Sequence, residues 1–244
     1  MDSSKTSAAQ FAYESLKSWI LSGSLAPGEK IDQDEAARKL SLSRMPIRSG
    51  LDRLAAEGLV LKIPRRGVIV SPLSPDSLNQ LFDVRAQIEA MAIMLTTTSA
   101  SEASIQNLYR MLQYQEDSTD HSLFSILEQN RSFHRYIVQL SGNEVLLRVF
   151  DNLWEQSERY RRMYFQTPNS NRRIQAEHRQ IVELIAARRV QEAADFIILH
   201  TRTSQRMILL SMERQLPPQQ FRLISLSPAP CSENHRTSAV CYNK

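Results

Sequence analysis

The stretch from Gly23 to Val70 constrains the fold of this chain more than any other part of the sequence, because several local signals follow one another in it without a gap. Asp32 can cap a short helix by accepting bonds from backbone N–H groups. The segment Ser41-Leu42 is too short to be more than a turn. Ser43 can cap a second helix, and Gly58 is suited to end it. We therefore expect two short helices that meet at a tight turn.

The second helix, expected from residue 44 to about 57, has an apolar face and a basic face. Apolar residues recur at helical spacing and predict the inward face: Ile47, Leu51, Leu54 and Ala55. The side chains left to point outward are Arg44, Met45, Arg48 and Arg53. Two short apolar strands, 59–61 and 68–70, then enclose the basic turn Pro64-Arg65-Arg66-Gly67. A helix over 8–22, with Phe11, Leu16, Trp19 and Ile20 as its apolar set, precedes them. This order predicts a winged helix-turn-helix.

The charge of this stretch points to nucleic acid. Eight Lys or Arg residues lie between positions 37 and 66, against two acids, although the whole chain has a net charge of only +4. A phosphate backbone favours such a basic face through release of counterions. The backbone N–H groups at the start of the helix after Ser43 would also face a phosphate. The second helix of such a unit normally lies in the major groove of duplex DNA.

Three segments carry a resemblance to a known family. PGEKI, LSLSRMPIRSGLDRLAAEGLV and PRRGVIV resemble the DNA-binding head of GntR-type bacterial transcription regulators over about residues 8–71. The resemblance implies DNA contacts from six residues: Ser43, Arg44, Met45 and Arg48 in the recognition helix, and Arg66 and Gly67 at a wing tip that enters the minor groove. Three residues depart from the family pattern. Ala36 replaces a usual Leu, Asp34 replaces an Arg that contacts DNA in some members, and Gly50 replaces Ala at an expected cost of about 1 kcal/mol.

The segment Ser71-Pro72-Leu73-Ser74-Pro75 reads as a short linker, after which only helical periodicity is found. Six helices are expected at 76–98, 101–118, 122–141, 143–165 (with a break at Pro168), 171–187 and 190–214. Short connections between long amphipathic helices predict an all-α antiparallel bundle. In the first of these helices, the expected inward residues are Leu78, Leu81, Phe82, Ile88, Met91, Ala92 and Leu95. The predicted domains are 1–72, 73–214 and a disordered tail over 215–244.

Composition excludes several other classes of protein. Six glycines are too few for a protein rich in sheet and turns. Both cysteines fall in the predicted tail, so no disulfide framework is expected. No apolar run approaches the roughly 20 residues of a membrane span, and no signal peptide is recognisable. We expect a soluble cytoplasmic protein with no membrane partner.

Three histidines of the predicted bundle can converge. His134 has Asn130 one helical turn before it, so both project from one face. His178 and His200 lie at equal distances from a turn near Arg189, which sets them at the same level of an antiparallel pair. Three imidazoles and one oxygen in a dry bundle would form a divalent metal site, Zn²⁺ in the first instance, with Ni²⁺ or Mn²⁺ as alternatives. Core histidines that are only hydrogen-bonded are the alternative.

The bundle also resembles a known domain. LFDVRAQIEAMA, NRSFHRYIVQLSGN, AEHRQIVELI and the late His200 resemble the FCD effector-binding domain of the FadR-type branch of that family, over about residues 75–214. The resemblance implies a metal held by Asp-x₃-His and two further histidines, with Asn130 here in the place of the Asp. It also implies a small carboxylate effector beside the metal and an arginine, Arg85, that pairs with it. An ion pair of Arg85 with Glu89 is the alternative. Tyr136, Asn143, Arg159 and Arg162 are further candidates for the same cavity.

These observations predict a bacterial transcription regulator. It would bind a double-stranded operator as a homodimer and respond to a small carboxylate, and the resemblance implies a repressor. A metalloenzyme is the first alternative, although no carboxylate is clearly placed as a general base. A DNA-binding protein whose bundle only dimerises is the second.

Overall fold

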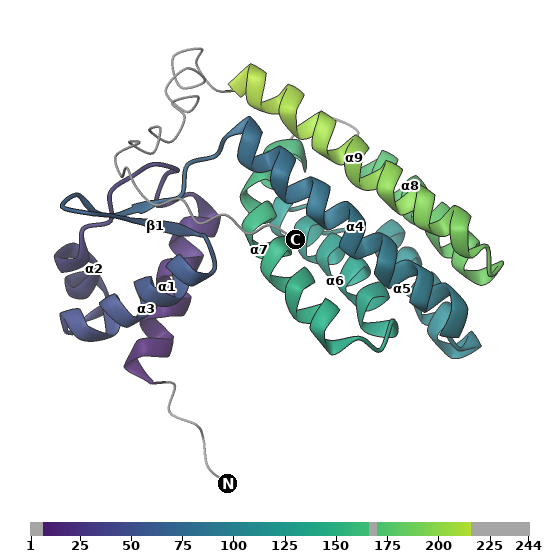
Figure 1. Cartoon of the computed structure of the whole chain (residues 1–244), viewed down its shortest axis with the longest axis horizontal. Coiled ribbons are helices and arrows are strands. Elements are labelled where there is room, and N and C mark those ends of the chain that lie inside the picture. Colours follow the sequence, from purple (N-terminus) through teal and green to yellow (C-terminus); the bar gives the residue numbers. More distant parts are fainter. Residues whose placement is uncertain (1–6, 166–169, 216–244) are drawn as a thin grey trace, which may run out of the picture.

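The structure is a computed structural model that describes residues 7–165 and 170–215 (Figure 1). Its first part is a head of three helices and a two-stranded antiparallel sheet: α1 Ala8–Ser22, α2 Gln33–Leu40, α3 Arg44–Ala56, β1 Val60–Ile63 and β2 Gly67–Val70. The prediction of a winged helix-turn-helix is confirmed, with the first strand one or two residues later than expected. The predicted tail lies, after residue 215, outside the described residues, as does the predicted break at Pro168.

Local signals explain how the two short helices of the head begin. Asp32 caps α2, because its Oδ1 atom accepts bonds from the backbone N–H groups of Asp34 and Glu35. Ser43 occupies the cap position of α3, but its side chain makes no capping bond. The first N–H groups of α3 are therefore not satisfied by a side-chain cap.

The core of the head lies between α1, α3 and the hairpin. Leu16, Ile47 and Leu54 are each fully buried there. Phe11 was expected in this core but is 45% exposed, and Tyr13 is buried instead. The inward face of α1 runs through residues 12, 13, 16 and 20, which places residue 11 on its outer edge.

Gly50 was expected only to weaken the helix α3, but the structure shows a second role for it. A Cβ atom at this position would lie 3.0 Å from the backbone nitrogen of Tyr13 and 3.1 Å from its Cα. The missing side chain thus lets α1 and α3 approach closely, so the glycine is a packing requirement of the head.

The wing is tied to the chain before α2. Its strands pair from Val60 with Val70 to Ile63 with Gly67. The backbone N–H of Ile31 also donates to the carbonyl of Val68 at 2.9 Å. This extra pairing fixes the base of the wing beside the helix pair.

The body is an all-α bundle, as predicted, and its helices differ from the expected bounds by no more than one residue. These helices are α4 Pro75–Ser99, α5 Glu102–Asp117, α6 Leu123–Leu140, α7 Glu144–Phe165, α8 Ser170–Ala186 and α9 Val190–Gln215. The long helix α4 lies along α9 (Figure 1) and also packs against α6, α7 and α8. No helix in the described part of the chain is long and apolar enough to cross a membrane.

The orientation of α4 differs from the one predicted. Met91 and Leu95 were expected inside but are 54% and 41% exposed. Arg85 and Glu89 are buried in their place, each with 3% of its surface exposed. The prediction was wrong because it counted only apolar side chains as inward, whereas a paired arginine and glutamate can also be buried.

The helix α7 connects the body to the head. The Lys17 Nζ atom of α1 lies 2.6 Å from Glu155 Oε2. Arg159 Nη1 donates to the carbonyl of Ser71 in the linker at 2.6 Å. These contacts hold the linker and the back of the head against one face of α7.

Candidate metal centre and nucleic-acid interface

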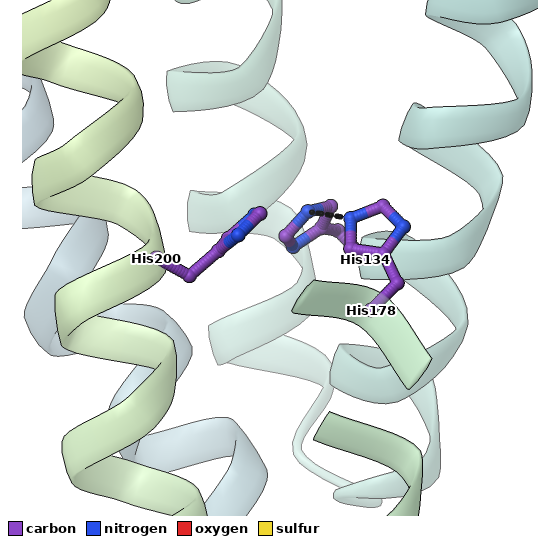
Figure 2. Close-up of side chains that lie close together, drawn as sticks. All are labelled: His134, His178 and His200. Atoms are coloured by element: carbon purple, nitrogen blue, oxygen red, sulfur yellow. Dashed lines mark hydrogen bonds between the residues drawn. The ribbon is translucent and has the colours of Figure 1, made fainter. Parts of the chain in front are cut away.

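Three helices bring three imidazoles together in the middle of the body. His134 comes from α6, His178 from α8 and His200 from α9, and each is at most 4% exposed. Figure 2 shows the three rings pointing toward one another. One ring nitrogen of each lies within 4.8 Å of the others, and the Nε2 atoms of His134 and His178 are 3.2 Å apart. Together they form a compact group of nitrogen donors.

Two carboxylates orient two of these rings from behind. Glu89 Oε2 lies 2.7 Å from the Nδ1 atom of His134, and Glu177 Oε2 lies 2.6 Å from the Nδ1 atom of His200. Each bond uses Nδ1 and leaves Nε2 for the centre of the group. This carboxylate–imidazole arrangement is typical of metal sites, where it fixes the ring and makes the ligand nitrogen more basic.

Burial keeps the imidazoles in the form that binds a metal. It lowers the pKa of His134 to about 4, although Glu89 acts in the opposite direction. Burial, and then the neighbouring imidazoles, hold the pKa of His178 well below its usual range. Burial alone would raise the pKa of the Glu89 carboxyl, but Arg85, and then the hydrogen-bonded His134, keep it well below its usual range. The imidazoles of His134 and His178 are therefore neutral at pH 7, the protonation state in which a histidine binds a metal.

Asn130 lies one turn before His134 on α6 and is 7% exposed. Its Oδ1 atom is buried and has no hydrogen-bond partner in the described part of the chain. A buried oxygen without a partner needs an explanation, and a bound cation is one. Three imidazoles and this carboxamide oxygen are a donor set that fits a divalent transition metal.

Arg85 forms the ion pair that was the alternative to anion binding. Its Nε and Nη2 atoms donate to Glu89 Oε1 at 3.1 and 2.7 Å. Arg85 also lines a small cavity of about 20 Å³ together with Asn130, His134 and His200. The guanidinium therefore stands beside the histidine group and holds the carboxylate that orients one of its members.

Arg161 of α7 lines the same cavity and was missed in the sequence. It is 4% exposed, and its guanidinium carbon lies 3.5 Å from the centre of the Trp154 ring. A signal was present, because residues 150, 154 and 161 share one helical face and the first two are a Phe and a Trp. An arginine on that face should have been assigned to the interior.

The other candidates for this cavity lie elsewhere. Arg159 reaches the linker, and Asn143 accepts bonds from the first N–H groups of α7. Tyr136 packs partly buried against the apolar core of the body. Arg162, next to Arg161, is half-buried, and it does not line the cavity.

The residues expected to contact DNA lie on the outer face of α3. Ser43, Arg44, Met45 and Arg48 are all exposed, Met45 by 74%. Arg44 forms an ion pair with Asp34 of α2. Asp34 therefore restrains the side chain of Arg44 beside the helix start.

The wing presents its basic turn away from the core. Arg65 and Gly67 have positive φ angles of 63° and 93°, which turn the chain sharply at the end of the hairpin. Arg66 stands exposed between them. The recognition-helix residues and the wing residues thus belong to the same head, as a groove-binding arrangement requires.

Comparison with known proteins matches two family models to this chain. Residues 8–70 match the model of bacterial regulatory proteins of the gntR family, and residues 80–203 match that of the FCD domain. The chain is 33% identical to the Nta operon transcriptional regulator of Aminobacter aminovorans, covering 71% of this chain and 81% of that protein. It is 29% identical to the HTH-type transcriptional repressor GlaR of Escherichia coli, covering 72% and 82%. A solved structure of E. coli McbR/YncC has the same fold, with a TM-score of 0.66 at 20% identity over 85% of this chain and 98% of that one.

Proposed function

We propose a function that proceeds from one premise: this chain belongs to the gntR family of bacterial regulatory proteins and carries an FCD domain. It is a DNA-binding transcriptional regulator and not an enzyme. The finer proposal is a cytoplasmic repressor whose operator affinity changes when a small carboxylate binds beside a divalent metal in the body. The repressor named among its relatives supports that direction of control.

The proposed DNA interface is the exposed face of α3 together with the wing. Arg44 and Arg48 would reach base edges or phosphates of the major groove, and the thioether of Met45 would contact a thymine methyl. Ser43 would stand beside a phosphate held by the uncapped N–H groups of α3. Arg66 and Gly67 would enter the neighbouring minor groove, where the glycine allows the backbone to approach closely.

The proposed metal ligands are Asn130, His134, His178 and His200. The observation that carries this proposal is the convergence of three buried imidazoles, two of them oriented by carboxylates, beside an unpartnered carboxamide oxygen. Zn²⁺ suits three nitrogen donors and one oxygen, with Ni²⁺ and Mn²⁺ as alternatives. A bound cation would supply positive charge and an open position for an effector carboxylate, and Arg85 would stand beside it.

The proposed homodimer uses the outer face of α4. Val84, Met91 and Leu95 recur at helical spacing on this face, and each is at least 41% exposed. Val145 and Val149 of α7 are also exposed, and α7 packs against α4. An apolar surface of this kind on two neighbouring helices is suited to a two-fold contact with a second copy. Such a dimer would present two heads to the two halves of an operator.

The proposed path from effector to DNA is α7. On one side of this helix, Arg161 lines the cavity beside the histidines, and the ring of Trp154 contacts that of His134. Glu155 and Arg159 on another side hold the head and the linker. An effector that binds two arrangements of α7 with different affinity would shift the balance between two placements of the head.

The test is a metal analysis of the purified protein followed by binding of a duplex selected in vitro from a random library. Metal near one equivalent per chain, lost in His178→Ala, is the expected result. The matched control is His121→Ala, because His121 is an exposed histidine of the body outside the group. Addition of carboxylates should change DNA affinity only in the metal-loaded protein. Absence of both metal and ligand response would leave dimerisation as the function of the body.

A further inference from the structure

We propose that the cavity beside the histidine group takes a small effector with two acidic groups, and that Arg161 is the anchor for the second one. This inference rests on the proposed function, because it assigns a ligand class to the same site. It starts from a residue that the expected ligand set does not include.

Arg161 is a buried cation whose bonds are incomplete. Its Nη1 atom donates to Ser157 Oγ at 2.7 Å, and its Nη2 atom donates to the carbonyl of Trp154 at 3.1 Å. Among the described residues, its buried Nε atom has no hydrogen-bond partner and no carboxylate lies within ion-pair distance of it. A guanidinium carries five N–H donors, so most of its capacity is unused. An isolated buried charge of this kind is costly unless an anion pairs with it.

The charges around the cavity leave an excess of positive charge. Arg85 and Glu89 neutralise each other through two hydrogen bonds. Arg161 has only longer-range attraction from Glu158 and Glu89, and Arg85 repels it. A divalent cation on the histidines would add two charges, and Asn130 would neutralise none of them. One carboxylate would neutralise only part of this excess positive charge, whereas a dianion would neutralise more of it.

The cavity also offers unused hydrogen-bond groups on α9. The Thr201 Oγ1 atom is buried without a partner in the described part of the chain, and Ser204 lies one turn further along α9. Both residues line the cavity with Arg161 and Asn130. Hydroxyls on α9 and a guanidinium on α7 can bind oxygens at two ends of a short ligand.

The size of the cavity limits the ligand. Its volume of about 20 Å³ corresponds to about one water molecule. A compact acid can enter when a few lining side chains rotate, but a nucleotide or an acyl thioester would require the helices to separate. Any acid must therefore displace lining side chains, and the shortest diacids require the least displacement.

The experiment compares acids that differ in one carboxylate. Metal-loaded full-length protein is titrated calorimetrically with malonate against propionate, succinate against butyrate, and glutarate against valerate, at constant ionic strength. At least one diacid is expected to bind ten-fold or more tightly than its monoacid. Arg161→Met should weaken binding of that diacid at least ten-fold and change the affinity for the monoacid by less than two-fold. The matched control is Arg162→Met, which alters the next residue of the same helix. It should change the affinity for neither acid.

A second variant keeps the test decisive if Arg161→Met does not fold. Asn130→Asp has almost the same shape and adds one negative charge beside the cation. It should strengthen metal binding and reduce the preference for the diacid. Equal binding of monoacids and diacids, an equal loss of both in Arg161→Met, or no binding of any acid would overturn the inference.

Measurements of metal and DNA on the same samples separate this inference from the proposed function. If metal and DNA bind and a monoacid alone controls DNA affinity, the proposed function stands and the inference of a diacid effector is wrong. If neither metal nor DNA binds, the proposed function itself fails.

Discussion

Replacement of Gly50 by alanine sets two opposing effects against each other in the recognition helix. Helix propensity alone predicts that the alanine stabilises α3 by about 1 kcal/mol. The new Cβ atom, however, would lie 3.0–3.3 Å from backbone atoms of Ala12 and Tyr13. Backbone atoms cannot rotate away as a flexible side chain can, so α1 and α3 must separate by several tenths of an ångström. Overpacking of this kind costs about 1–3 kcal/mol. We expect a net loss of about 1 kcal/mol.

Urea unfolding followed by circular dichroism measures this difference, and hydrogen exchange of the α1 and α3 peptides locates it. The matched control is Ser49→Ala, because Ser49 is exposed on the same helix. That change should stabilise the helix by a few tenths of a kcal/mol, since alanine has the higher propensity. Equal or greater stability of Gly50→Ala, with α1 exchange unchanged, would refute the argument from close packing.

Four further outcomes are expected. Arg48→Ala should weaken binding of the selected duplex at least ten-fold and leave the dimer intact by light scattering, because Arg48 is exposed on α3. His178→Ala should lose metal by mass spectrometry and lose the thermal stabilisation that metal gives, about 2.7 kcal/mol at a hundred-fold excess over Kd. Metal-free protein should lose stability in urea as pH falls from about 6.5 to about 4, because the unfolded chain protonates His134 at its ordinary pKa of 6.5 while the folded chain resists until about 4. Lys17→Met should destabilise the protein by about 1–2 kcal/mol, since it removes the ion pair between head and body and leaves Glu155 only its longer contact with Arg131, and effectors should then no longer change DNA affinity in a fluorescence-polarisation assay.

Much of the fold was predictable because its signals are local. Asp32 caps α2 through its own side chain, and the spacing of Ile47, Leu51 and Leu54 sets the inner face of α3. The prediction that His178 and His200 lie side by side followed from their equal distances to the turn between two antiparallel helices. Such features depend on a few neighbouring residues or on simple helix geometry, so the sequence alone contains them.

Other parts depend on pairs of residues that are distant in the sequence. Glu89 supports His134 across 45 positions, and only the packing of α4 against α6 brings them together. Arg161 was missed because a charged side chain is usually placed outside, and its burial depends on the ring of Trp154. The exposed Met91 was assigned inward because no local pattern distinguishes a core face from an exposed apolar face.

The division of α7 into two faces also limits how its sequence can change over evolution. Trp154 faces the histidine group and Glu155 the head, and neighbours on a helix point about 100° apart. Insertion or deletion of one residue between 159 and 161 would turn Arg161 out of the cavity while the contacts of Glu155 and Arg159 stayed in place. Insertion of seven residues would restore the direction but move Arg161 about 10 Å along the helix. Relatives that share the proposed coupling should therefore vary α7 by substitution, and gain or lose residues only beyond its ends.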